Sequence, residues 1–280
     1  MTRGDAAGTI GKPGGDGGRI VAGGADRTER DAIVERVMAE LEAHARPLKG
    51  FDPHRYFRTT ATTTFLNTGT PFMRRLGRVI AREHRAVWSL ADVLAVADVL
   101  VRDARFEAKG VGIEVLASFH ARFAPSLLPR LKPWLARDHA ANWATTDALC
   151  GYVIGPLLLA YPDLAADVAT WATHRNLWVR RASAVALIKP AVKAGGTALD
   201  AAFEVATALR GDPHRLIHKA VGWLLREAGR SDADRLVRYL RDGGSRIPRT
   251  TVRYAIERFP PALRNDLLQG TRGDAPRTGR

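Results

Sequence analysis

Apolar residues recur at helical spacing along most of the chain. Ile33, Val34, Val37, Met38 and Leu41 follow one another at intervals that place them on one face of an α-helix. The strict alternation of apolar and polar residues that is typical of exposed strands is nearly absent between residues 30 and 265. The hydrophobic pattern therefore predicts an all-α protein.

A second stripe, from Leu90 to Leu100, follows a helix-start signal. Ser89 precedes the stripe and Asp92 stands three residues later, as in a capping box in which each side chain bonds the other residue's backbone amide. Similar periodic segments predict further helices at about 105–123, 127–137, 142–154, 164–173, 178–189, 199–209, 214–227, 232–241 and 248–258.

The breaks between these segments are short and contain Gly, Pro, Asn or Asp, as at 124–126, 161–163 and 211–213. Helices joined by such short connections pack as antiparallel neighbours. A succession of them predicts stacked helical pairs of the HEAT-like kind, which form a curved solenoid with a concave groove. A globular helical bundle is the alternative, because no strict sequence period is visible.

Composition divides the chain into three parts. Nine of the 26 glycines fall within residues 1–28, so this Gly-rich leader is expected to be disordered. Residues 269–280 are rich in Gly, Arg and Pro and predict a disordered basic tail. Residues 29–268 are expected to form a single helical-repeat domain.

The charge balance suggests a polyanionic partner. The 280-residue chain is 46% hydrophobic, as in folded proteins, and carries 43 Lys and Arg against 29 Asp and Glu, a formal charge of +14. Nucleic acid is the first candidate for a protein this basic. The partner expected is duplex DNA, and because a groove that wraps DNA needs no symmetry mate, a monomer is predicted.

Other classes of protein are disfavoured. Cys150 is the only cysteine, which excludes an internal disulfide and multi-cysteine metal clusters. His214 and His218 have a metal-ligand spacing, but Arg215 and Lys219 beside them would repel a cation, so no metal and no cofactor is predicted. The longest membrane-like stretch, 148–162, is too short to span a bilayer, and no signal peptide is visible, so we expect a cytoplasmic protein without membrane contact.

The candidate chemistry lies in two segments about 30 residues apart. Trp143 and Asp147 stand one helical turn apart on one face, so that an indole and a carboxylate address one small space. Trp178 opens a later helix and is followed by Arg180 and Arg181, whose guanidinium groups suit phosphate. The alternative is that both tryptophans belong to the core and Asp147 is a solvated position.

Four segments in order resemble the motifs of one known family. They are PheLeuAsnThrGlyThrPro (65–71) with MetArgArg (73–75), Trp143 with Asp147, LeuTrpValArgArgAlaSer (177–183), and HisLysAlaValGlyTrpLeuLeuArgGlu (218–227). These segments look like the AlkD-like DNA glycosylases, the HEAT-like-repeat branch of the DNA alkylation repair enzymes. The resemblance spans about residues 30–265, although Ala144 stands where many relatives have an acidic residue.

The resemblance implies an activity and a set of roles. Such proteins excise cationic N3- or N7-alkylated purines, in some members bulky adducts, from duplex DNA without flipping the damaged base. By that match Trp143 and Trp178 are the aromatic walls against the lesion's deoxyribose, and Asp147 is the catalytic carboxylate. A carboxylate and indole faces favour the oxocarbenium-like sugar of the transition state, which is chemically consistent with these roles.

Basic residues in these motifs and near the C-terminus are candidate phosphate contacts. The predicted DNA-binding residues are Arg74, Arg75, Arg180, Arg181, Lys219, Arg226, Arg249 and Arg253. The alternative function is a non-catalytic helical-repeat module that binds DNA structures or an acidic protein. The two functions differ at Asp147, which only a glycosylase requires.

Overall fold

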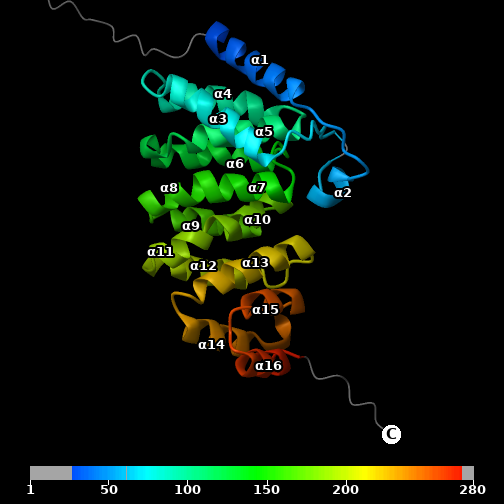
Figure 1. Ribbon diagram of the computed structural model, residues 1–280. Coiled ribbons are helices and arrows are strands. Elements are labelled where there is room, and N and C mark those ends of the chain that lie inside the picture. Colours follow the sequence, from blue (N-terminus) through cyan, green and yellow to red (C-terminus); the bar gives the residue numbers. More distant parts are fainter. Residues whose placement is uncertain (1–26, 61, 273–280) are drawn as a thin grey trace, which may run out of the picture.

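The computed structural model describes residues 27–60 and 62–272, which fold into α-helices (Figure 1). The helices up to residue 160 are α1 (Arg27–Ala43), α2 (Pro53–Phe57), α3 (Thr70–His84), α4 (Leu90–Arg102), α5 (Phe106–Ala117), α6 (Leu128–Ala136), α7 (Trp143–Leu149) and α8 (Gly155–Ala160). The later helices are α9 (Leu164–Ala169), α10 (Leu177–Ala186), α11 (Ile188–Lys193), α12 (Gly196–Ala208), α13 (Arg215–Ala228), α14 (Ala233–Gly243), α15 (Arg249–Ala255) and α16 (Pro261–Gly270).

The helices stack in chain order from α1 at one end of the molecule to α16 at the other (Figure 1). Helices α3 and α4 both pack against α5, and α13 packs against both α10 and α15. Within the described ranges no β-strand is present, and Thr64 and Arg105 form an isolated bridge. The all-α class and the stacked helical pairs predicted from the sequence are therefore confirmed.

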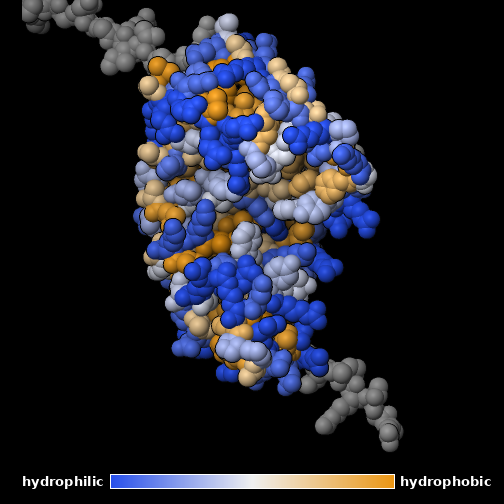
Figure 2. Space-filling model, in the orientation of Figure 1, coloured by the Kyte–Doolittle hydropathy of each residue, from blue (hydrophilic) through white to orange (hydrophobic). Residues whose placement is uncertain are grey.

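The apolar stripe of α1 and the capping box of α4 have the structural roles that the sequence predicted. Ile33, Val37 and Leu41, one stripe of α1, are buried against the stack. Ser89 and Asp92 form the complete capping box at the start of α4. The face that Figure 2 shows is mainly hydrophilic, with hydrophobic residues gathered in patches between hydrophilic ones.

The helix that begins at Trp143 runs further than the sequence predicted. It was expected to end at Ile154, yet it continues to Ala160 through a π-turn at Cys150–Ile154. The wider turn lets the Gly155 amide donate to the Cys150 carbonyl and carries the helix past Pro156, which has no amide hydrogen to donate.

By length and composition alone, residues Trp143–Ala160 are apolar enough to cross a membrane. Half of this segment is buried inside the structure. It packs between α5 on one side and α10 and α11 on the other. Its apolar side chains thus form part of the core of the stack.

Three helices and the limits of the fold differ from the sequence prediction. Helices α2, α3 and α16 were not predicted, although α3 buries Met73, Leu76 and Ile80 at helical spacing. The first helix begins at Arg27 and the last ends at Gly270, so each extends two residues into the segments expected to be disordered. Residues 1–26 and 273–280, on which those expectations chiefly fall, lie outside the described residues.

Candidate functional site

Asparagine caps fix the start of the two helices that carry the predicted site residues. Asn142 Oδ1 accepts a hydrogen bond of 2.8 Å from the Thr145 amide at the start of α7. Asn176 Oδ1 accepts one of 2.8 Å from the Trp178 amide at the start of α10. Each cap satisfies a backbone donor that the first helical turn leaves free. Trp143 and Trp178 are thereby held in the first turns of their helices.

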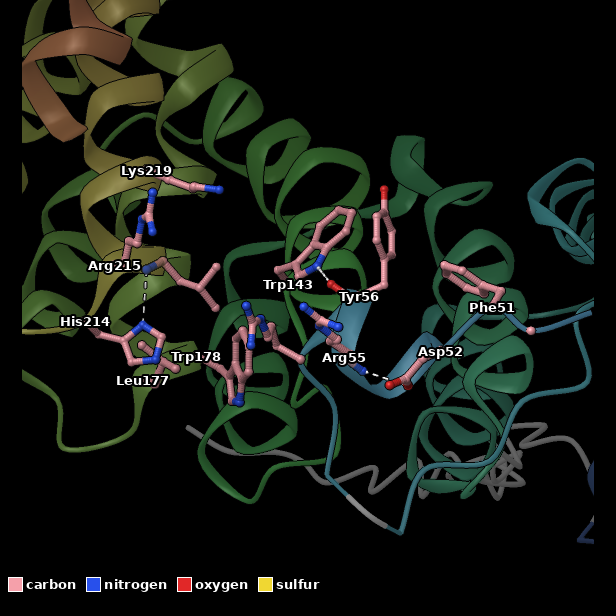
Figure 3. Close-up of a pocket in the computed structure, with 13 residues that line it drawn as sticks. Phe51, Asp52, Arg55, Tyr56, Trp143, Leu177, Trp178, His214, Arg215 and Lys219 are labelled. Atoms are coloured by element: carbon pink, nitrogen blue, oxygen red, sulfur yellow. Dashed lines mark hydrogen bonds between the residues drawn. The ribbon is translucent and has the colours of Figure 1, made fainter. Parts of the chain in front are cut away.

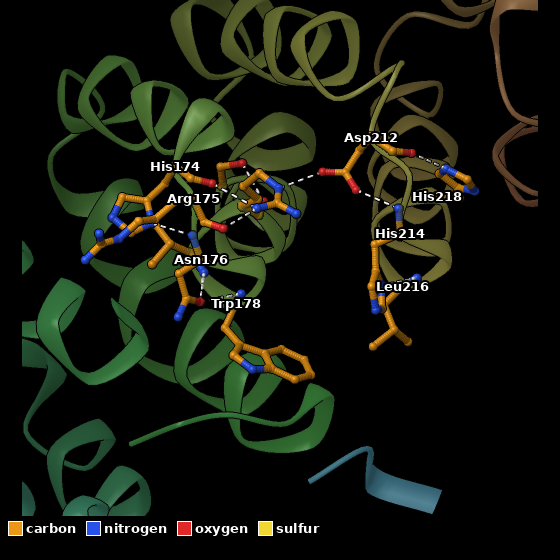
Figure 4. A network of polar contacts seen from close by, with 11 residues as sticks. His174, Arg175, Asn176, Trp178, Asp212, His214, Leu216 and His218 are labelled. Carbon is orange, nitrogen blue, oxygen red and sulfur yellow. Dashed lines mark hydrogen bonds and ion pairs between the residues drawn. The ribbon is translucent and has the colours of Figure 1, made fainter. Parts of the chain in front are cut away.

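A polar network joins the N-terminal ends of α10 and α13 (Figure 4). Arg180 Nε donates to Asp212 Oδ2 at 2.6 Å, and Arg180 Nη1 donates to the His174 and Arg175 carbonyls at 2.9 and 2.8 Å. The other Asp212 oxygen accepts the His214 amide at 2.8 Å. Arg180, a predicted phosphate contact, therefore has at least two of its donors engaged inside the protein.

Asp147 on α7 is bound by Arg181 on α10. Arg181 Nε and Nη2 donate to the two Asp147 oxygens at 2.8 and 2.7 Å, and Arg181 Nη1 donates to the Leu216 carbonyl at 2.7 Å. The side chain of Arg181 is 7% exposed and that of Asp147 is 17% exposed. Such a two-bond pair fixes the orientation of the carboxylate. The structure thus places Arg181, predicted to contact DNA, on the carboxylate instead of on the open surface.

Burial shifts the pKa values of Asp147 and Cys150. Burial raises the pKa of Asp147 above its ordinary value, and the hydrogen bonds and charge of Arg181 oppose that rise. Burial also raises the pKa of the Cys150 thiol, and the nearby Asp147 charge adds to the effect. Cys150 is fully buried, as expected for a core residue.

Asp147 lines a cavity of about 680 Å³, called the Asp147 cavity below. Its lining residues are Tyr56, Phe57, Thr70, Met73, Arg74, Phe106, Gly110, Ile113, Glu114, Trp143, Ala144, Thr145, Asp147, Ala148, Gly151, Tyr152, Val185, Ile188, Lys189 and Trp223. Two indoles, Trp143 of α7 and Trp223 of α13, therefore share a cavity with the carboxylate.

Two cations meet at Tyr152 on the edge of this cavity. Arg74 Nη2 donates to the Tyr152 hydroxyl, and the Arg74 guanidinium lies 5.0 Å from the centre of the Tyr152 ring. Lys189 Nζ lies 5.6 Å from the same ring centre and donates to the Gly151 carbonyl at 2.7 Å. Arg74, a predicted phosphate contact, is thus held beside the site.

Figure 3 shows a second cavity of about 820 Å³, called the Trp178 cavity below. It is lined by Gly50, Phe51, Asp52, Arg55, Tyr56, Arg58, Trp143, Leu177, Trp178, His214, Arg215, Leu216 and Lys219. Trp143 and Tyr56 line both cavities. The Trp143 Nε1 donates to the Tyr56 carbonyl at 2.8 Å, and their ring centres are 5.6 Å apart. Helix α2 thus contributes lining residues to both cavities.

Both predicted aromatic walls line the Trp178 cavity, but only Trp143 also lines the Asp147 cavity. Trp143 lies in both cavities, whereas Trp178, which is 7% exposed, lines only the Trp178 cavity. Trp223, which the sequence analysis did not assign to the site, lines the Asp147 cavity. The signal for Trp223 was present in the segment at 218–227, but spacing along the chain does not show which indole packs toward α7. Tyr56 and Tyr152 had no local signal.

The other predicted DNA-binding residues differ in their surroundings. Lys219 and Arg253 have no ion pair or side-chain hydrogen bond among the described residues. Arg75 lies 5.2 Å from the Phe72 ring centre, Arg226 pairs with Glu227 and Glu257, and Arg249 donates to the Leu268 carbonyl at 2.7 Å.

The pKa of Arg249 is lowered by burial and by the charges of Arg272 and Arg253. In the part of the chain that the structure describes, no cluster of three or more His, Cys, Asp or Glu side chains has the arrangement of a metal site.

Comparison with known proteins adds two findings. Residues 37–259 match the model of a family described as DNA alkylation repair enzymes. A solved structure, described as a predicted DNA alkylation repair enzyme from Enterococcus faecalis, superposes with a TM-score of 0.65 at 15% identity. The match covers 74% of this chain and 93% of that one, which shows a shared fold. A comparison with curated proteins found no match.

Proposed function

Because the chain belongs to the DNA alkylation repair enzyme family, we propose that it is a DNA glycosylase that excises cationic N3- or N7-alkylated purines from duplex DNA. The observation that supports this most directly is the carboxylate of Asp147, held by Arg181 at the wall of a cavity that also contains Trp143 and Trp223. The proposal keeps Trp143 and Asp147 from the sequence analysis and replaces Trp178 by Trp223 as the second aromatic wall.

The chemistry requires stabilisation of the sugar more than of the base. An N3- or N7-alkylated purine is already cationic, so it leaves as a neutral base when it takes the electron pair of the C1′–N bond. Positive charge then develops on the deoxyribose. The Asp147 carboxylate and the negative faces of the two indoles interact more strongly with that cation than with the neutral sugar of the ground state.

Water completes the reaction. Its oxygen bonds to C1′ and it loses one proton, so the products are an abasic site, the free purine and a proton. Asp147 in its ionised form orients this water and accepts its hydrogen bond. Arg181 holds the carboxylate in place without reaching the sugar, which makes it a positioning residue.

The size of the Asp147 cavity bears on the substrate. It is about 680 Å³, and Arg74, Tyr152 and Lys189 are among its lining residues. A site in which the base remains stacked in the duplex sets no tight limit on the alkyl group. We therefore include bulky purine adducts among the proposed substrates.

The test is release of free base from duplex DNA that carries N7-methylguanine or N3-methyladenine. We expect the wild type to release base, and Asp147→Asn to lower the rate by about 10²- to 10³-fold at equal DNA occupancy. Asp163→Asn is the matched control, because Asp163 is exposed and its loss changes the net charge by the same amount.

A second function, a non-catalytic module that binds DNA, is favoured by the formal charge of +14. It predicts salt-dependent binding without release of any methylated or bulky purine, and unchanged binding by the Asp147→Asn variant. That combination of results would contradict the glycosylase proposal.

A further inference from the structure

Apart from Trp143, the residues that line the Trp178 cavity have no part in the chemistry proposed above, yet they combine cationic and aromatic side chains. We propose that it is a binding site for one unstacked deoxynucleotide, in which aromatic side chains hold the base and four cations hold the phosphate. If the nucleotide belongs to a DNA strand, that strand is the one proposed to bind at the Asp147 cavity. In that case the inference rests on the proposed function.

The four cations of the cavity are the first observation. Arg55 and Arg58 belong to α2 and its end, and Arg215 and Lys219 belong to α13. Among the described residues none of these four side chains makes an ion pair or hydrogen bond. By contrast, Arg180 and Arg181 nearby are paired with carboxylates.

The arrangement of these cations suits an anion held between two elements. Figure 3 shows Arg215 and Lys219 facing Arg55 across the cavity. The carboxylate in the lining, Asp52, accepts the Arg55 backbone amide as the cap of α2 and so neutralises one of four charges at most. Cations that line one cavity repel one another, and a bound phosphate reduces that repulsion.

The aromatic side chains are the second observation. Tyr56 is 56% exposed and Phe51 is 46% exposed, although large aromatic side chains usually bury most of their surface. Trp143 and Trp178 line the cavity between α2 and α13 (Figure 3). The exposed rings of Tyr56 and Phe51 beside cations are the features by which proteins hold unpaired nucleotides, because every base offers a π-face.

His214 adds a neutral donor. Its Nδ1 accepts the Leu216 amide at 3.1 Å, so the ring hydrogen is on Nε2. Burial lowers the pKa of His214, and the charges of Arg180, His218 and Arg181 add to this while Asp212 opposes it. A neutral imidazole in the cavity wall can donate one hydrogen bond to a phosphate or to a base carbonyl.

Size and position favour a nucleotide over an acidic peptide. The volume of about 820 Å³ lies within the range of about 300–1,000 Å³ that small-molecule sites occupy. Acidic peptides need cations but have no use for four aromatic residues. The cavity also shares Trp143 and Tyr56 with the Asp147 cavity, so a strand bound at one is within reach of the other.

The test compares three probes by titration of the full chain. They are a fully paired duplex, the same duplex with one unpaired thymidine, and free 5′-dTMP, which is followed by tryptophan fluorescence. The variant is Arg55→Gln with Arg215→Gln. Its control is Arg130→Gln with Arg238→Gln, which removes the same charge from two exposed arginines outside both cavities.

We expect the wild type to bind the bulged duplex about tenfold or more tighter than the paired duplex, from stacking of one base. The Arg55→Gln/Arg215→Gln variant should reduce this ratio to near one, and the control should keep it. Removing two positive charges weakens binding to both duplexes by a similar factor, because the two duplexes carry similar charge. That factor therefore cancels in the ratio of the two affinities. Saturable binding of 5′-dTMP that needs Arg55 and Arg215, without a bulge preference, would support the site and identify free nucleotide as its ligand.

Three results would overturn the proposal. The first is a wild type with neither bulge preference nor saturable binding of 5′-dTMP. The second is a bulge preference that the Arg55→Gln/Arg215→Gln variant retains, and the third is equal competition by a poly-glutamate peptide of matched charge. Asp147→Asn should lose base release and keep the bulge preference, so failure of the glycosylase proposal and failure of this site are measured separately.

Discussion

At the scale of single residues, the pair of Asp147 and Arg181 controls the charge of the proposed catalytic group. Burial raises the pKa of this carboxyl group and Arg181 opposes the rise. Because the reaction needs the ionised form, the rate should fall as the pH drops through a pKa that lies above the ordinary value of an aspartate. Without Arg181, the effect of burial on the pKa of Asp147 is unopposed, so that pKa rises further. The fall in rate then occurs at higher pH.

The expected effect of replacing Arg181 follows from the direction of this pKa shift. Arg181→Gln should shift the acidic limb of the single-turnover rate toward neutral pH and lower the rate at pH 7 by about 10- to 100-fold, since the carboxylate is no longer held in place. Arg175→Gln, at an exposed neighbouring position, should leave the profile unchanged. An unshifted limb in Arg181→Gln would show that the pair does not set the ionisation of Asp147.

A second prediction at this scale distinguishes Trp223 from Trp178. Trp223 shares the cavity of Asp147 and Trp178 does not. Trp223→Phe should lower the rate of base release by about 2- to 30-fold, the effect of weakening one cation–π contact of about 0.5–2 kcal/mol. Trp178→Phe should stay within about twofold of the wild type. The reverse order in single-turnover assays would restore Trp178 as the second wall.

At the scale of elements, α13 and α15 are in close contact at Gly222, the residue before Trp223. A Cβ on Gly222 would lie 2.5 Å from Tyr254 Cβ and 2.8 Å from the Thr251 carbonyl oxygen. The hydroxyl of Thr251 donates to the His218 carbonyl at 3.0 Å, which joins the same two helices. The glycine that precedes Trp223 is therefore required by packing.

This contact gives a prediction about stability. Gly222→Ala should lower the free energy of unfolding by about 1–3 kcal/mol, because the helices must separate and the gain in helix propensity is smaller. Gly270→Ala is the control, since no atom lies within 4 Å of its added Cβ. Urea unfolding measures both variants. If Gly222→Ala unfolds at the same urea concentration as the wild type, α15 moves away from α13 without loss of stability.

Helix α2 is the element that completes both cavities. Its Phe57 ring stacks on Phe106 with ring centres 4.6 Å apart and lies 5.6 Å from the Trp143 ring. The segment that follows is anchored by Glu107, whose carboxylate accepts the Leu66 and Asn67 amides at 3.0 and 2.6 Å. These contacts join α2 to α5 and α7, although little in its own sequence predicted a helix there.

At the scale of the whole molecule, the formal charge of +14 should make DNA binding strongly dependent on salt. We expect log Kd to rise linearly with log salt concentration, with a slope of about 0.9 for each phosphate contacted. Lys219→Gln should reduce that slope by about one contact, because Lys219 has no partner among the described residues. Arg238→Gln should leave it unchanged, and equal slopes for the wild type and Lys219→Gln would exclude Lys219 from the interface.

The sequence by itself determined the class of fold and the family. The helical spacing of apolar residues and the capping box of Ser89 and Asp92 act within one or two turns, so they can be read without knowledge of the fold. Trp143 and Asp147 were found together for the same reason, since they are four residues apart on one helix.

Only the tertiary structure decided which distant side chains meet. Asp147 and Arg181 are 34 residues apart, and their contact depends on how α7 packs against α10. The same packing places Trp223 in the Asp147 cavity and Trp178 outside it, and it turns two predicted phosphate contacts, Arg180 and Arg181, inward. Helix packing is set by the shapes of whole faces, which the local signals of a sequence do not specify.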